Sequence, residues 1–160
     1  MSDPSRYRTA DALRRALDDR IVGEARNSGL SPQRLRKEVA FERLLARLLI
    51  VSREGWVLKG GLALAFRLGA TSRTTLDIDI ARADDVDRAT EDIRAAGQLD
   101  LGDHFNFAIE GPRELDLQGR ARVARYGVRV ELANRRFDAF SVDVAFEAVA
   151  PDAEVLTVAN

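Results

Sequence analysis

The sequence contains no cysteine and a single histidine, His104, among its 160 residues. The lack of cysteine excludes a disulfide framework, a thiolate zinc site and a thiol nucleophile. One imidazole is too few for most histidine metal sites, so a bound metal ion would need oxygen ligands. We expect His104 to serve as a surface or loop-capping residue rather than as a catalytic one.

Long apolar runs are also missing. Residues 1–20 are polar and charged where a signal peptide would need an apolar core, and no run approaches the roughly 20 residues of a membrane span. The sequence therefore predicts a soluble, cytoplasmic protein with no membrane partner. The 25 basic and 26 acidic residues nearly cancel, which argues against a histone-like cationic binder.

Hydrophobic residues make up 46% of the chain, enough for one core but not for two independent ones. We expect a single domain over residues 1–160, with a helical arm at 1–30, a core at 31–147 and a tail at 148–160. Residues 75–103 hold nine acidic and three basic side chains, whereas 112–136 hold seven basic and three acidic. This pattern fits either solvated helix faces or a cation-binding centre beside a surface for polyanions.

Hydrophobic periodicity predicts helices around 13–21, over 32–53, over 62–68 and over 84–96, with Ser31 and Asp84 as N-caps of the second and the last. Strands are expected over 56–58, 74–80, 105–110, 120–132 and 137–146. We expect Gly111-Pro112 to end the third of these strands, and residues 133–136 to form a hairpin turn. The order predicts an α/β domain with a mixed, largely antiparallel sheet flanked by helices.

Asp77 and Asp79 stand two residues apart in the predicted strand 74–80. The period of two in a strand sends both carboxylates to the same face. Like charges at that spacing repel each other, so they are tolerated only where water solvates them or a cation bridges them. Taken alone, the pair is better explained by a wet face on an edge strand.

Asp143 is a lone carboxylate in the apolar segment 140–146. Its desolvation is costly unless a partner compensates for it, and an arginine would be an ordinary partner. If this strand instead lies beside the strand 74–80, the three aspartates converge. They would then form an oxygen-ligand site suited to one or two magnesium ions.

Lys59, Gly60 and Gly61 occupy the junction between a predicted strand and a predicted helix. Glycine lets the backbone approach a phosphate closely, and a helix N-terminus favours an anion. A tight turn with a solvated lysine explains the same three residues. The Walker loop, GxGxxG, the serine nucleophile elbow and HExxH are all absent from the sequence.

Together these segments resemble the nucleotidyltransferase fold shared with polymerase β. Two stretches are similar to motifs of the AbiEii/AbiGii family of nucleotidyltransferase toxins: LKGGLAL at 58–64 resembles its glycine turn, and RTTLDID at 73–79 resembles its DxD strand. This family includes the mycobacterial-type toxin-antitoxin nucleotidyltransferases. Residues 119–123 and 140–144 are similar to the arginine-bearing hairpin of that family and its strand with a third aspartate. The resemblance covers about residues 31–147.

The resemblance implies the toxin of a toxin-antitoxin or phage-defence system. Such an enzyme moves a nucleoside monophosphate from an NTP to an RNA acceptor, here expected to be the 3′ end of tRNA, and thereby blocks translation. It depends on one or two Mg²⁺ ions. By this resemblance Asp77 and Asp79 hold magnesium on the triphosphate, while Asp143 holds the second metal and helps to activate the attacking hydroxyl.

The resemblance also implies roles around the triphosphate. Gly60 and Gly61 would cradle the phosphates, and Lys59 and Arg73 would offset the charge that leaves with pyrophosphate. Some antitoxins of the family are kinases that phosphorylate a residue just before the DxD motif, and Thr75 has that place here. A phosphate there would disfavour nucleotide binding by charge repulsion, although strand propensity alone explains a threonine.

Several alternatives stay open. Longer members of the family continue into a helical region with a further lysine and aspartate, so the chain is expected to be a natural short form, a truncated chain or an inactive relative. A catalytically silent nucleotide-binding or partner-binding module would keep the fold, and a nucleotidyltransferase that modifies a protein hydroxyl would keep the chemistry. The hairpin offers four arginines for contacts with RNA phosphates, of which wet-face exposure alone explains some: 120, 122, 125 and 129.

Overall fold

A five-stranded sheet with helices packed against it forms the centre of the structure, a computed structural model that describes residues 7–61, 63, 76–116 and 122–147. The strand order is β1-β2-β5-β4-β3, so strands distant in sequence become neighbours. The helices are α1 (Ala10–Ser28), α2 (Pro32–Val51) and α4 (Val86–Gln98). The strands are β1 (Val57–Leu58), β2 (Ile78–Arg82), β3 (Phe105–Asp116), β4 (Arg122–Leu132) and β5 (Arg135–Phe146).

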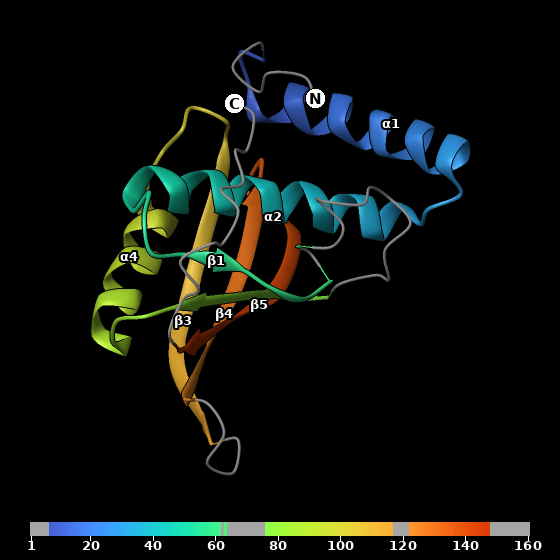
Figure 1. Cartoon of the computed structure of the whole chain (residues 1–160). Helices are drawn as coiled ribbons and strands as arrows, with labels where there is room; N and C mark the ends of the chain where they lie inside the picture. The colour runs from blue at the N-terminus through green and yellow to red at the C-terminus, as the bar shows by residue number, and fades with distance from the viewer. Residues whose placement is uncertain (1–6, 62, 64–75, 117–121, 148–160) are drawn as a thin grey trace.

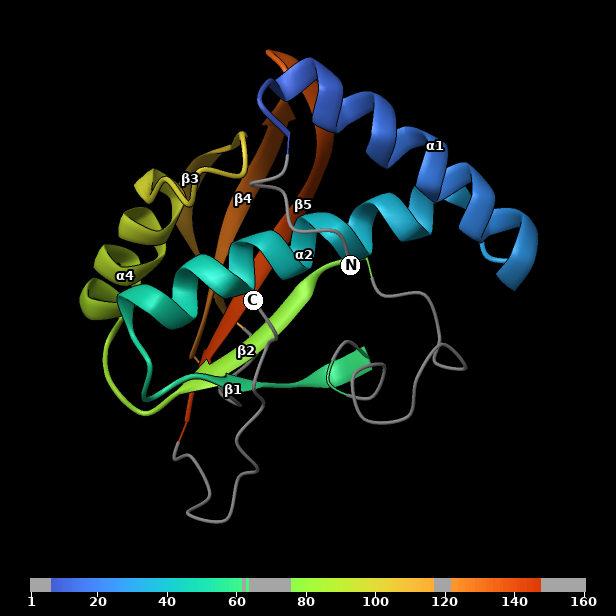
Figure 2. The same ribbon diagram turned by 90° about the horizontal axis from the view of Figure 1, so that it is seen from above.

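Strand β2 pairs with β5 in parallel, and every other described pairing is antiparallel. The predicted mixed, largely antiparallel sheet is therefore confirmed. Helix α2 crosses the strands with α4 beside it, and α1 lies further out against α2 (Figures 1 and 2). None of the described helices combines the length and the apolar character that a bilayer crossing requires.

The caps of the first two helices follow directly from the sequence. Thr9 accepts a hydrogen bond from the backbone of Ala12, and Gly29 ends α1 in the left-handed region at φ 72°. Ser31 accepts from the backbone of Arg34, with proline in the first turn of α2. The predicted cap at Ser31 is confirmed, and α2 lies close to the expected range 32–53, whereas α1 extends beyond the expected range 13–21 at both ends.

The predicted cap of α4 is wrong by one residue. Asp85, not Asp84, accepts the hydrogen bond from the backbone of Arg88. Asp84 is instead bound by the guanidinium of Arg82, which also donates to Asp92 at 2.8 Å. Because the Arg82 side chain is buried, two acids are drawn to it, and the cap falls to the acid that remains.

The strand predicted to end at Gly111-Pro112 continues beyond them. The register between β3 and β4 shifts between Glu110 and Arg113, so Gly111 and Pro112 form a bulge inside β3. Gly111 has φ 116°, and a Cβ there would lie 2.9 Å from the carbonyl oxygen of Arg125. Proline is tolerated because β3 is an edge strand, where a missing donor breaks few ladder bonds.

The hairpin between β4 and β5 turns on two residues rather than the four predicted. Ala133 and Asn134 both have positive φ, 55° and 54°, as a tight two-residue hairpin turn requires. Further along β4, Val123 and Ala124 are both buried, so the alternation of buried and exposed residues breaks there.

The sheet has a covered face and an open face in the described part of the chain. The covered face holds the apolar side chains that pack with α2 and α4 in one core, among them Ile78, Ile80, Tyr126, Val142 and Val144. Successive side chains of a strand point to opposite faces. The residues between these positions, Asp79, Asp143 and Arg125, therefore lie on the opposite face.

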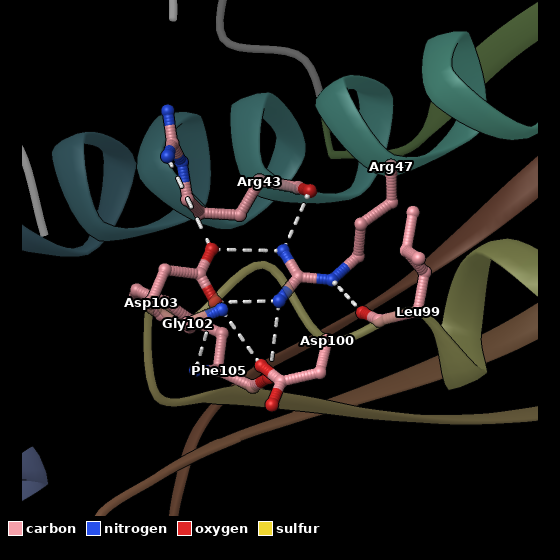
Figure 3. Close-up of polar contacts among 7 residues, drawn as sticks. All are labelled: Arg43, Arg47, Leu99, Asp100, Gly102, Asp103 and Phe105. Atoms are coloured by element: carbon pink, nitrogen blue, oxygen red, sulfur yellow. Dashed lines mark hydrogen bonds and ion pairs between the residues drawn. The ribbon is translucent and has the colours of Figure 1, made fainter. Parts of the chain in front are cut away.

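A buried arginine fixes the loop between α4 and β3 (Figure 3). The Arg47 side chain from α2 has an exposure of 0% and donates to both carboxylate oxygens of Asp103, at 2.9 and 2.5 Å. It also donates to the carbonyl oxygens of Leu99 and Phe105. These hydrogen bonds from the Arg47 guanidinium hold the loop against α2 at its start, Leu99, and at its end, Phe105.

Helix α1 is tied to the far end of the sheet. Arg14 donates to the carbonyl oxygens of Leu132, Arg135 and Arg136 at the hairpin turn. His104 shares a hydrogen bond of 2.9 Å with the carbonyl oxygen of Tyr7, just ahead of the helix. This contact agrees with the loop-capping role expected for the histidine.

Candidate active site

Two of the predicted site aspartates are direct neighbours on adjacent strands. Asp79 of β2 and Asp143 of β5 are paired positions in the parallel ladder, and both flanking pairs are apolar and buried on the other face. The strand of Asp143 thus lies beside the strand of Asp79, which is the arrangement that convergence of the aspartates requires. Neighbouring strands lie only about 5 Å apart, so the two acidic side chains share one patch of the open face.

Asp77 lies differently from its prediction. Strand β2 begins at Ile78, so Asp77 stands just before the strand rather than inside a strand 74–80. Its carboxylate oxygen Oδ1 accepts a hydrogen bond of 3.0 Å from the backbone nitrogen of Ser141 on β5. The side chain thereby extends the β2–β5 contact by one step and holds Asp77 close to the strand that carries Asp143.

The Lys59-Gly60-Gly61 segment reaches the same patch. The backbone nitrogen of Lys59 donates to the carbonyl oxygen of Asp79 at 2.7 Å, and a helical turn begins at Gly60. Gly60 has φ 65°, and a Cβ added to it would lie 2.5 Å from the carboxylate oxygen Oδ2 of Asp79. Glycine is favoured here because an L side chain is strained at this φ, and its Cβ would also shift the carboxylate of Asp79.

The charge of Asp79 is incompletely balanced. Burial raises the pKa of its carboxyl above the ordinary value, and the negative charges of Asp143 and Asp77 raise it further. Arg125 and Lys59 oppose this shift of the pKa only in part. A cation near Asp79 would therefore relieve both the desolvation and the repulsion.

Arg125 of β4 neutralises Asp143. Its Nε donates to Oδ1 at 2.7 Å and its Nη2 donates to Oδ2 at 2.6 Å, a bidentate pair between opposed residues of two strands. An arginine partner for Asp143 is thus present, as the simpler explanation of this acid anticipated. Lys59 is held by the carboxylate of Glu147, and both of these side chains are more than 40% exposed, at 43% and 41%.

The donor set fits a hard divalent cation, although the ligands are not gathered around one point. The acids offer only oxygen, Asp79 carries uncompensated charge, and the guanidinium of Arg125 already places positive charge beside Asp143. Within the described ranges no three acidic or histidine side chains are positioned to hold an ion as they stand. Both oxygens of Asp143 are engaged by Arg125, and one oxygen of Asp77 accepts from a backbone nitrogen.

The other sequence-predicted residues fall into two groups. Gly61 belongs to the helical turn that starts at Gly60. Arg73 and Thr75, expected to contact the nucleotide, and Arg120 of the hairpin lie outside the described residues. The structure adds Glu147, the partner of Lys59, which the sequence analysis did not single out.

The strand that carries Asp79 lies beside a parallel strand that carries Asp143, and a glycine turn lies against the first of these strands. This arrangement agrees with a nucleotidyltransferase type of fold. A family-level comparison matches residues 43–160 to the family described as nucleotidyl transferase AbiEii toxin, type IV TA system. The chain belongs to this family of nucleotidyltransferase toxins, so the predicted resemblance is confirmed.

Two solved structures from Helicobacter pylori share the fold. JHP933 matches with a TM-score of 0.51, and a protein assigned as a nucleotidyltransferase matches with 0.53. Each is 19% identical and is matched over 81% of this chain. The chain spans about half of each, 50% and 52% of their lengths. No curated protein matches the chain.

Proposed function

We propose that the protein is a Mg²⁺-dependent nucleotidyltransferase that transfers a nucleoside monophosphate from an NTP to the 3′ end of tRNA and so blocks translation. The observation that carries the proposal is the pairing of Asp79 with Asp143 in adjacent strands, with the Gly60 turn against the Asp79 carboxylate. Membership of the AbiEii toxin family supports the reaction class. We further propose that residues 1–160 form a single domain and that the protein acts in the cytoplasm.

Three acids of the open face are the proposed metal ligands: Asp77, Asp79 and Asp143. One or two magnesium ions held there would neutralise the triphosphate and stabilise charge that develops at the α-phosphate. The Gly60 and Gly61 backbone would approach the phosphates, because no side chain blocks the turn and a helical turn starts there.

In the proposed reaction the oxygen of an acceptor hydroxyl bonds to the α-phosphorus of the NTP. The bond from that phosphorus to the bridging oxygen of the β-phosphate breaks, and pyrophosphate leaves with the electron pair. Asp143 takes the proton of the hydroxyl, with its carboxylate freed from Arg125. Lys59 and Arg73 balance the charge of the departing pyrophosphate.

The outward arginines of β4 are the proposed contacts for RNA phosphates. In the structure each described one faces an acid on a neighbouring strand: Arg122 with Glu114, Arg125 with Asp143, and Arg129 with Glu110. The first and the last of these pairs are more than half exposed on both sides, at 60% and 58%, and at 56% and 75%. Exposed pairs contribute only about 0.2–1 kcal/mol, so phosphates can replace these acids.

The type IV toxin-antitoxin family implies an antitoxin partner. We propose that this partner acts at the nucleotide site, and that a kinase antitoxin would modify Thr75. A phosphate two residues before Asp77 adds about two negative charges next to acids whose own repulsion already raises the pKa of Asp79. Mass spectrometry of the toxin after exposure to its antitoxin and ATP tests this, and an unmodified residue 75 would rule the kinase out.

Transfer from an NTP labelled on the α-phosphate tests the proposed function. The protein is incubated with total tRNA, Mg²⁺ and each of the four NTPs, and labelled RNA is resolved on a gel. We expect label in tRNA with at least one NTP, and its loss in Asp77→Ala and Asp79→Asn. Glu131→Gln, on the exposed face of β4, is the control and retains the label. Absence of label with every NTP would refute the proposal, and label in protein instead would identify a protein hydroxyl as the acceptor.

A catalytically silent binding module is the second candidate, and the bidentate pair between Arg125 and Asp143 favours it. An acid that is permanently neutralised in this way has a structural role in the sheet rather than a role in catalysis. The two functions differ in pyrophosphate release. The silent module binds NTP without releasing pyrophosphate, and its toxicity on expression is unchanged by Asp79→Asn.

A further inference from the structure

Arg125 lies where it controls access to Asp143. The two residues are opposed across β4 and β5, and the guanidinium engages both carboxylate oxygens at 2.7 and 2.6 Å. Asp143 is in turn the ladder partner of Asp79. One arginine therefore stands on the far side of Asp143 from Asp79, within the same open face of the sheet.

A bidentate guanidinium and a divalent cation compete for one carboxylate. The arginine uses a lone pair on each oxygen and turns both toward β4. A cation bound to the same oxygens would also meet the full positive charge of the guanidinium at close range, and arginine cannot relieve this repulsion by losing its proton. The two occupants are thus mutually exclusive or strongly antagonistic.

The contact is built so that it can be released. The Arg125 side chain is 44% exposed, whereas the Asp143 side chain is 18% exposed, so the arginine can swing to solvent while the acid stays in place. Arg129 on the same face makes only a single contact with Glu110, at 3.7 Å. Within the described part of β4, the bidentate geometry is confined to the arginine that faces the site.

We propose that Arg125 is a built-in competitor of the metal at Asp143: it neutralises this acid in the metal-free protein and must release it before a divalent cation binds between Asp143 and Asp79. The inference rests on the proposed function for the identity of the metal-binding acids. It agrees with the lack, among the described residues, of a three-ligand cluster around the paired Asp79 and Asp143. It also makes Arg125 a positioning residue, because it acts through Asp143 rather than on the nucleotide.

Titration with Mn²⁺ alone, followed by the electron paramagnetic resonance signal of the free ion, tests the inference without NTP or RNA. Arg125→Met removes the charge and both hydrogen bonds, and we expect it to bind Mn²⁺ about three- to tenfold more tightly than the parent protein. Arg125→Lys keeps the charge but loses the bidentate contact, and we expect an intermediate affinity. Asp143→Asn should bind more weakly, and adding Arg125→Met to it should bring no gain.

Arg113→Met is the matched control. Arg113 is exposed and is the cross-strand neighbour of Arg125 on β3, so the variant removes an equal charge one strand further from Asp143. We expect its Mn²⁺ affinity to stay within twofold of the parent protein. Unchanged or weaker binding by both Arg125 variants, or an equal gain in Arg113→Met, would overturn the inference.

The two proposals fail in different ways. If the protein never labels RNA but binds Mn²⁺ more tightly after Arg125→Met, the proposed function is refuted and the inference about Arg125 stands. If the protein labels RNA but its Mn²⁺ affinity does not depend on Arg125, the proposed function stands and the inference about Arg125 is refuted. Thermal melting of each variant identifies any that is unfolded, and Arg125→Lys, the milder change, then decides the question alone.

Discussion

Replacing Gly60 by alanine probes the contact between the glycine turn and the Asp79 carboxylate. The backbone at φ 65° is unfavourable for alanine, at about 1–2 kcal/mol. The new Cβ would also lie 2.5 Å from Oδ2 of Asp79, whereas ordinary contact begins near 3.4 Å, so this carboxylate oxygen must shift by about 0.9 Å. A displacement of about 1 Å in a catalytic array typically reduces rates by about 10²-fold.

Gly29→Ala provides a control that separates the two effects. Gly29 has a similar φ, 72°, but nothing lies within 4 Å of a Cβ added there. Both variants should lose similar stability in urea unfolding, about 1–2 kcal/mol. Only Gly60→Ala should lose label transfer by about 10²-fold, with a matching loss of Mn²⁺ affinity. Equal activity in the two variants would refute the claim that the turn positions Asp79.

Three further predictions concern charge and stability. The pKa of Asp79 is raised in the folded protein, so ionisation of this carboxyl disfavours the folded state. Asp79→Asn should therefore be more stable than the parent protein at pH 7. The difference in melting temperature between the two should shrink as the pH falls toward 3.8, the ordinary pKa of the carboxyl. Arg47→Met leaves Asp103 buried without its bidentate partner and should cost about 3–5 kcal/mol in urea unfolding, whereas Arg122→Met on the surface should change stability by less than about 1 kcal/mol. Ala133→Gly relieves a positive φ in the hairpin turn and should stabilise the fold by about 0.5–1 kcal/mol by the same measurement; no gain would mean that the turn is unstrained.

Local signals in the sequence predicted most of the elements. The cap at Ser31 was predictable because it depends on contacts within one helical turn, which a short sequence window contains. The prediction of Asp84 as the cap of α4 was wrong because a side chain outside the helix competes for this acid. Arg82 binds Asp84, and the neighbouring Asp85 caps the helix instead. The break predicted at Gly111-Pro112 failed because a bulge on an edge strand absorbs both residues.

The candidate site aspartates could be picked out from the sequence because period-two alternation reveals a carboxylate in an apolar strand. The partner of Asp143 was not found, because register in a hairpin depends on irregularities that alternation does not report. Counting outward from the pair of Leu132 with Arg135 places Asp143 opposite Ala124. The register shift between Val130 and Glu131 moves it opposite Arg125 instead.

The central claim is that Asp79 and Asp143 bind one divalent cation together, and its most direct test is a crystal soaked with Mn²⁺ and a non-hydrolysable NTP, measured for anomalous scattering. We expect a manganese peak bonded to oxygens of both acids, with Arg125 turned away from Asp143. A structure with bound nucleotide in which Arg125 still holds both oxygens of Asp143, and manganese is absent from Asp79, would contradict it.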